Sequence, residues 1–253
     1  MKSSAMKSRI QIARNRIRHQ RGFSEVLAFT LMTLFVYTPL FFGLFFIGMN
    51  LIVNIQVNNL ARDMDNMYIH GTDFSTYNGQ QLAQQLATGL GLQFPAFGST
   101  SGVTNTNQAT NEGTSGNGII WVTQIMYVGT TSQALCTSIS PATCTNANSF
   151  VYTQQIVFGN SSLTSQKDTS VGYYTGTGIS TGGVITSPLT DSYAKLGSTA
   201  QTTMDNQWQT TSNGQASLTD GQTVYIVEAF FQTPTISLGS IYPSAGTYAR
   251  YFF

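Results

Sequence analysis

Apolar positions fall into three patterns along the chain. Residues 26–53 are almost continuously apolar, whereas residues 53–68 keep apolar side chains only at spacings of three and four. The second pattern is typical of a helix with one buried face. Beyond residue 118, short runs rich in β-branched and aromatic residues alternate with polar stretches, as in strands and their connections. We therefore expect a long helix followed by a mixed α and β domain.

The continuous apolar segment predicts a membrane helix. No charged residue occurs between Glu25 and Arg62, and about 20 apolar residues are enough to cross a bilayer. A cleaved export signal has an apolar region of roughly 7–15 residues followed by small residues at the cleavage point. This segment is longer and has no such site, so we expect it to remain as an anchor. Pro39 removes a backbone donor within it and predicts a kink.

We expect the same helix to continue beyond the membrane and to stop at Gly71. From residue 24 to residue 70 it would be about 70 Å long at 1.5 Å per residue. Asp63 and Asp65 belong to the polar side of this second half. The apolar side forms a predicted docking stripe that packs on a sheet, comprising Val53, Val57, Leu60, Met64 and Met67.

The rest of the chain predicts an α+β domain with an antiparallel sheet of about four strands. A second, shorter helix is expected over residues 75–93, with Leu82, Leu86 and Leu90 on one face, and a short helix within residues 191–209. Residues 98–118 and 129–148 are expected to be loops. The predicted strands are residues 119–128 and 149–158, paired as a hairpin, then 223–231 and 247–253.

Charge is distributed unevenly, although the net charge is only +1. Seven Lys and Arg residues precede Gly22 with no acid among them, while the remainder has four basic and ten acidic residues, a net charge of −6. A basic block beside an apolar span marks the cytoplasmic side of a membrane, which we prefer to a nucleic-acid site. The predicted organisation is a basic leader or tail over residues 1–22, a transmembrane helix over 23–56, and an extracytoplasmic domain over 57–253.

The two cysteines, Cys136 and Cys144, bracket seven residues in "CTSISPATC". An extracytoplasmic domain lies in an oxidising compartment, so the spacing favours a disulfide, and two free thiols are the alternative. Little else suggests chemistry. His70 is the one histidine outside the basic tail, and Asp63 and Asp65 point away from each other on a helix. We expect no enzymatic activity, metal site or cofactor.

The head of the chain resembles a prepilin, and more closely the TadE-like minor pilins or pseudopilins of tight-adherence (Tad) pilus systems. The matching pieces are Arg21-Gly22, Glu25, the apolar helix, the "AR" in "NNLARDMDNMYIHG", and "VYIVEAFFQTP" near the C-terminus. They cover roughly residues 15–72 and 222–232. The resemblance implies cleavage by a membrane peptidase between Gly22 and Phe23.

Glu25 departs from the usual pilin pattern. Pilins place a glutamate fifth after the cut, where it meets the free amine of a neighbouring subunit, whereas Glu25 would be third. The difference turns the carboxylate by about 200° around a helix. The alternative is that Glu25 lies at the headgroup level of an uncut anchor, because a carboxylate in hydrocarbon is unfavourable.

The expected function is therefore structural: a pilin-like or pseudopilin component of a Tad-type pilus or related secretion apparatus. Its partners would be other pilus subunits, an inner-membrane assembly platform, membrane lipid and a prepilin peptidase, with no nucleic acid. It would sit in the inner membrane with its N-terminus cytoplasmic. The alternative is a single-pass anchored extracytoplasmic binding or adhesion protein unrelated to a pilus.

Overall fold

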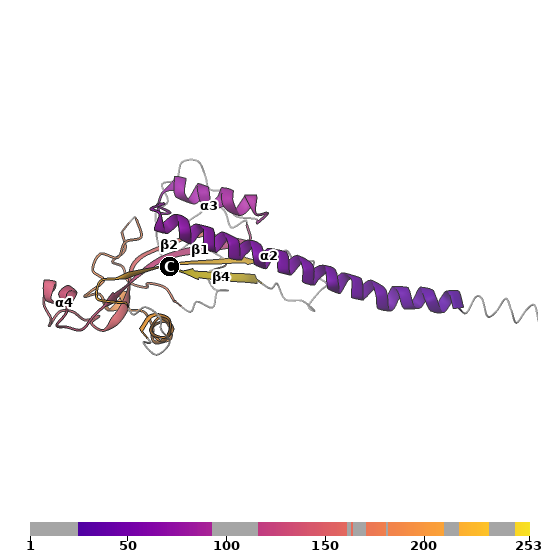
Figure 1. Ribbon diagram of the computed structural model, residues 1–253. Helices are drawn as coiled ribbons and strands as arrows, with labels where there is room; N and C mark the ends of the chain where they lie inside the picture. Colours follow the sequence, from indigo (N-terminus) through magenta and orange to yellow (C-terminus); the bar gives the residue numbers. More distant parts are fainter. Residues whose placement is uncertain are drawn as a thin grey trace, which may run out of the picture. The chain divides into compact units, whose positions relative to one another are not determined.

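The computed structural model describes residues 25–92, 116–160, 163, 171–180, 182–209, 218–232 and 246–253. The chain forms two units, one ending at Ile52 and the other beginning at Val53, and each is described by itself (Figure 1). The predicted basic segment over residues 1–22 and most of the predicted loop over residues 98–118 lie outside the described residues.

The first unit contributes the apolar part of a helix that runs over Glu25–Ile69. It is the one helix in the described ranges that is long and apolar enough to cross a membrane. Its large apolar side chains are exposed all round, from Val26 to Ile52. Hydroxyl groups in this segment are satisfied locally, since Thr30 donates to the carbonyl of Val26 at 2.8 Å. Such internal pairing is what a lipid environment demands of polar groups.

A π-helical turn, η1 (Thr33–Tyr37), lies just before Pro39, and only Thr38 stands between them. The amide of Thr38 donates to the carbonyl of Thr33, and its hydroxyl donates to the same oxygen at 3.0 Å. A widened turn next to a proline is a recognised origin of helix bending. The structure thus places a backbone irregularity where the sequence predicts a kink.

In the second unit, the end of α2 (Thr38–Ile69) is closed by Gly71 as predicted. Gly71 adopts a φ of 90°, and its amide donates to Tyr68 at 3.0 Å. The amide of Thr72 donates to Met67 at 3.0 Å. These two bonds form a Schellman motif, which needs a left-handed residue that glycine adopts without strain.

A four-stranded antiparallel sheet forms the centre of the second unit, in the order β2-β1-β3-β4. Strands form here because the runs are β-branched and aromatic. The predicted α+β layout with a long helix, a shorter helix and such a sheet is confirmed. β1 and β2 pair with each other, as the predicted hairpin requires. The strands are β1 (Gly118–Val128), β2 (Ser149–Gly159), β3 (Thr223–Gln232) and β4 (Gly246–Phe252).

One face of the sheet packs against the end of α2 and against α3 (Tyr77–Gly89). Ile120, Val122 and Val227 of the sheet share this core with Leu60 and Met64 of α2. α3 lies beside the end of α2 (Figure 1).

The buried face of α3 agrees only in part with the leucine face that the sequence predicts. Leu86 and Leu90 are partly buried against the core. Ala83 and Ala87 are fully buried, whereas Leu82 is 43% exposed. Small side chains at the contact let the helix backbone approach its neighbours closely, which leaves the larger Leu82 at the edge. The helix begins at Thr76, whose hydroxyl accepts from the amide of Gly79 at 3.2 Å.

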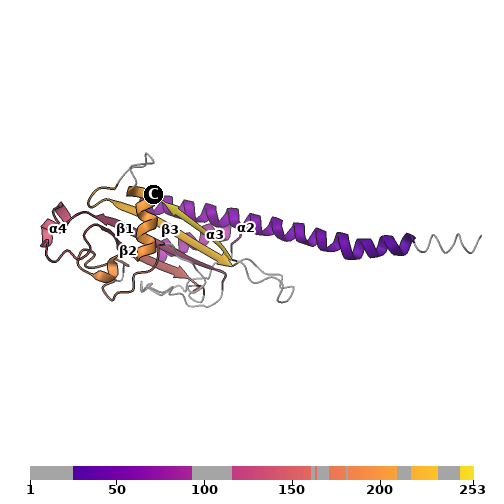
Figure 2. The ribbon, with the colours of Figure 1, turned by 90° about the horizontal axis from the view of Figure 1, so that it is seen from below.

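The opposite face of the sheet is covered by short helices and irregular chain. Seen from below, the orange α5 crosses in front of the strands (Figure 2). The expected short helix within residues 191–209 is present as three consecutive elements. The predicted loop over 129–148 is wrong in part, because it contains a helix that buries Cys136 in this second core. These elements are α4 (Ala134–Ile139), η3 (Ser192–Ala194), α5 (Ser198–Met204) and η4 (Asp205–Gln209).

Candidate functional site

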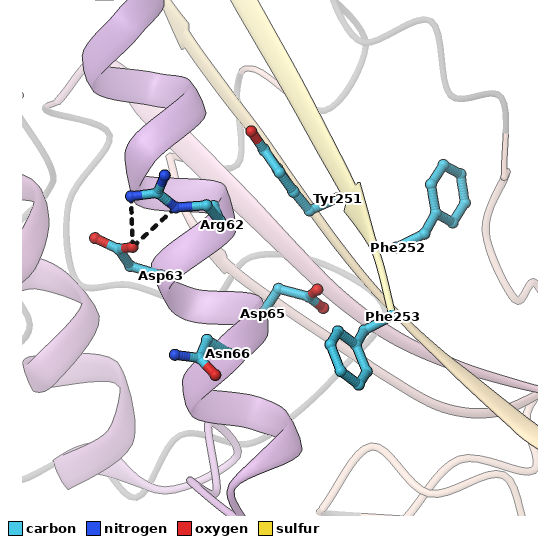
Figure 3. A pocket seen from close by; sticks show the side chains of 7 residues that line it. All are labelled: Arg62, Asp63, Asp65, Asn66, Tyr251, Phe252 and Phe253. Atoms are coloured by element: carbon cyan, nitrogen blue, oxygen red, sulfur yellow. Dashed lines mark hydrogen bonds and ion pairs between the residues drawn. The ribbon is translucent and has the colours of Figure 1, made fainter.

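A pocket of about 260 Å³ opens where the end of α2 meets the end of β4 (Figure 3). The helix contributes charged and amide side chains, and the strand contributes aromatic rings. Its lining residues on the helix are Arg62, Asp63, Asp65 and Asn66. Tyr251, Phe252 and Phe253 line it from the other side.

The end of β4 is held in place by backbone pairing with β3. The amides of Phe253 and Tyr225 each donate to the other residue's carbonyl at 2.9 Å. Because side chains alternate along a strand, Tyr251 and Phe253 point to the helix side. Phe252 points away from Asp65 (Figure 3) and lies under the guanidinium of Arg250, whose Cζ is 4.5 Å from the ring centre.

Asp65 is the unusual residue of the pocket. The sequence assigns it to the polar side of the helix, and this is wrong: Asp65 is only 4% exposed. It follows Met64 and lies one turn after Ala61, both fully buried, so it stands at the margin of the packed stripe. No described group makes a hydrogen bond to its Oδ1. Burial raises the pKa of the Asp65 carboxyl from 3.8 to about 6, because desolvation disfavours the charged form.

Arg62 does not neutralise Asp65. Its Nε and Nη2 both lie 3.3 Å from Oδ1 of Asp63, and the two side chains are 59% and 42% exposed. An exposed ion pair of this kind contributes about 0–1 kcal/mol to stability. Taken as ionised groups, the three side chains carry one excess negative charge, and it is located on Asp65.

A second pocket, of about 370 Å³, lies between the last turn of α2 and the middle of the sheet. Its polar groups are largely paired with one another. The hydroxyl of Tyr68 donates to Oε1 of Gln154 at 2.6 Å, and Nε2 of Gln154 donates to the carbonyl of Gly182 at 2.7 Å. The Tyr68 ring meets the Tyr225 ring edge-on at 5.0 Å. The polar groups of this pocket therefore hold the helix end and the sheet together.

The opposite face of the sheet holds a buried acid. Glu228 is 1% exposed and accepts a hydrogen bond from the hydroxyl of Tyr248. It pairs across strands with Trp121 and Arg250. Burial, and then the charge of Glu228, raises the pKa of the Tyr173 hydroxyl to about 12. The glutamate is thus embedded among aromatic and basic partners and supports the sheet.

The predicted docking stripe lies against the sheet in the second unit. Val57, Leu60 and Met64 have no exposed surface. Val53 and Met67 are partly buried and pack on the same core. The stripe is therefore the helix's contribution to the domain's own core.

The other predicted site residues are dispersed. Gly22 and Phe23 lie outside the described residues, and Glu25 is exposed in the first described turn. His70 is exposed, and its Nδ1 lies 2.7 Å from the carbonyl of Asn66, which is a local contact. No group of three or more potential metal ligands occurs in the described ranges.

The two cysteines form a disulfide, with Cα atoms 5.4 Å apart. The segment before it is fastened by Asp220, whose two carboxylate oxygens accept the amides of Gly129 at 2.7 Å and Leu135 at 3.0 Å. In the sequence, Asp220 is followed by Gly221, a pair that is typical of a turn and indicates nothing further. Its role depends on residues some 90 positions away, so local pattern offers no signal for it.

Tyr174 is a second residue that sequence reasoning missed. Its ring is fully buried, its hydroxyl donates to Oδ2 of Asp191 at 2.6 Å, and it accepts the amide of Gly178 at 2.9 Å. A Cβ on Gly176 would lie 2.4 Å from the tyrosine oxygen. Residues 175–178, Thr-Gly-Thr-Gly, thus bend around one hydroxyl group.

Comparison of the chain with protein-family models, with curated proteins and with solved structures finds no match.

Proposed function

We propose that this chain is a minor pilin-like or pseudopilin structural component of a Tad-type pilus or a related secretion apparatus. One observation carries the proposal, namely the change in character along the helix Glu25–Ile69. Up to Ile52 its apolar side chains are exposed, as lipid or neighbouring helices require. From Val57 to Tyr68 the same helix supplies the core of a four-stranded sheet. One helix thus provides both a membrane anchor and part of the domain core. This arrangement is what we expect of a subunit that is first inserted in a membrane and then packed among similar helices.

The proposed orientation places the basic N-terminal segment in the cytoplasm and residues 57–253 outside. Seven positive charges precede the apolar span, and positively charged flanks stay on the cytoplasmic side. The disulfide between Cys136 and Cys144 supports this orientation, because such bonds persist in oxidising compartments. Protease added to intact spheroplasts should digest the domain and spare a tag at the N-terminus. Digestion of the tag instead would reverse the orientation.

The mature N-terminus tests the pilin assignment. Mass spectrometry of the chain purified from its native membranes should find a polypeptide that begins at Phe23. Gly22→Leu should block this processing, because the resemblance places the glycine at the cut. Ser24→Ala, two residues further on, is the matched control and should leave processing intact. An intact basic tail in the wild-type protein would instead favour the plain anchored binding protein.

Assembly tests the function itself. The processed chain should co-fractionate with fibres sheared from the cell surface or with the membrane complex that assembles them. Gly22→Leu should stay in the membrane fraction. If the wild-type chain never leaves the membrane and associates with no assembly complex, the structural role in a fibre fails even if processing occurs.

A further inference from the structure

We propose that the pocket between the end of α2 and the end of β4 binds a primary ammonium group carried on an alkyl chain. The inference starts from Oδ1 of Asp65, which is buried with no hydrogen-bond partner among the described residues. Leaving such an acceptor unsatisfied is unfavourable, more so when it is charged. A cation that enters the pocket would compensate the charge of this poorly solvated carboxylate. The proposal does not depend on whether the chain enters a fibre.

The carboxyl group can present either oxygen to the pocket. Asp65 lines the pocket, and its carboxyl group points toward the end of β4 (Figure 3). The terminal torsion of an aspartate is broad and nearly two-fold, so a half-turn exchanges Oδ1 and Oδ2 without moving the backbone. The two oxygens are equivalent, so a ligand meets the same carboxylate whichever of them is covered, and the charge of that carboxylate is what the pocket offers.

Charge selects a cation as the ligand. Arg62 makes its ion pair with Asp63, so Asp65 has no neutralising partner in the pocket. An anion would meet two carboxylates, and a neutral donor would leave the excess negative charge uncompensated. A bound cation also favours the ionised form of a carboxyl whose pKa burial raises to about 6.

The shape and lining of the pocket select an alkylammonium over a metal ion. Hard metal ions take six or more oxygen ligands, and no group of three acidic or metal-ligating residues occurs in the described ranges. The pocket offers one unpaired carboxylate beside the side chains of Tyr251 and Phe253. Methylene groups can pack on the rings while the ammonium reaches the carboxylate, and aromatic faces attract cations. A lysine side chain of a partner protein and a small free amine share this chemistry.

The test uses the full chain in detergent micelles and n-butylammonium chloride as the probe, with binding measured by calorimetry against equal sodium chloride. We expect saturable binding to the wild-type protein. Asp65→Asn keeps the shape and removes the charge, so binding should weaken about tenfold or more. Asp73→Asn removes an exposed acid that does not line the pocket and keeps an oxygen to accept the amide of Ser75, so it should change affinity by no more than about twofold.

Two further arms keep the test decisive. n-Butanol has the same chain without the charge and should not bind, which checks charge recognition in the wild-type protein even if a variant fails to fold. Equal binding of butanol and butylammonium, or equal binding of butylammonium by wild type and Asp65→Asn, would overturn the proposal. The peptide acetyl-Gly-Lys-Gly-amide distinguishes the sources. If it binds at least as well as butylammonium, the ligand is a protein lysine; if only butylammonium binds, it is a free amine.

Discussion

The hydroxyl of Tyr68 donates a 2.6 Å hydrogen bond to Oε1 of Gln154, and so joins the last turn of α2 to the middle of β2. The two residues are 86 positions apart in the chain. The bond lies beside the edge-on contact between Tyr68 and Tyr225. It therefore fixes the helix end against two strands of the sheet at once.

Removing this hydroxyl should destabilise the domain. Tyr68→Phe leaves the Gln154 oxygen without its partner, and we expect the free energy of unfolding to fall by about 1–3 kcal/mol. The measurement is denaturant unfolding of the full chain in detergent, followed by near-ultraviolet circular dichroism. Tyr193→Phe is the control, because Tyr193 is exposed and its replacement should have little effect. Equal effects of the two changes would contradict the role of the bond.

The buried stripe of α2 should be far more sensitive to truncation than the outer face of α3. Leu60→Ala opens a cavity in the helix–sheet core and should lower the free energy of unfolding by about 2–5 kcal/mol. Leu82→Ala removes the same atoms from a side chain that is 43% exposed and should lower the free energy of unfolding by less than about 1 kcal/mol. Thermal unfolding of the two variants in the same detergent makes the comparison. Similar losses would mean that Leu60 is not part of the core.

Asp65 predicts a distinctive dependence of stability on pH. The pKa of this acid is higher in the folded protein, about 6, than the ordinary value of 3.8. Folding therefore takes up a proton between these values, and this contribution makes the folded state more stable as pH falls from 7 to 4. The difference amounts to at most about 3 kcal/mol at pH 7.

Comparison with Asp65→Asn isolates this contribution from the other acids. The variant should be more stable than the wild-type protein at pH 7, and the advantage should shrink on acidification to pH 4. The measurement is the unfolding midpoint of both proteins at pH 7, 6, 5 and 4 in the same detergent. An advantage that stays constant with pH would show that Asp65 does not titrate in this range. Asp73→Asn, which removes an exposed acid outside the pocket, serves as the control.

Asp220 should be needed to hold the disulfide-bearing segment. Asp220→Ala removes the acceptor of two backbone amides, those of Gly129 and Leu135, and should destabilise the protein by about 1–3 kcal/mol. Hydrogen exchange of those two amides should accelerate, while exchange within β1 should change less. Unchanged protection of both amides in the variant would contradict this role.

Local pattern was enough to predict most elements of this fold, although it missed α4. The β-branched runs, the helical spacing from Val53 to Tyr68, and Gly71 as the helix end each depend on residues close together in sequence. The contacts made by Asp65, Asp220 and Tyr174 do not. Asp65 is buried because β4, almost 190 residues later, packs beside it, and no spacing of apolar residues along one helix contains that information. Leu82 is exposed because α3 packs on its neighbours through Ala83 and Ala87. The spacing of leucines along α3 does not indicate which side these neighbours cover.

The register of β2 shifts at Thr153, where the partner of Gln124 is Gln154 and the partner of Ile125 is Tyr152. Tyr152 and Ile156 are four positions apart, which in a regular strand would place both side chains on one face. The extra residue instead turns Tyr152 toward the layer of short helices and leaves Ile156 toward α2 and α3. A single strand thereby serves two hydrophobic interiors. Deleting Thr153 would move the side chains along half of β2 from one hydrophobic interior to the other.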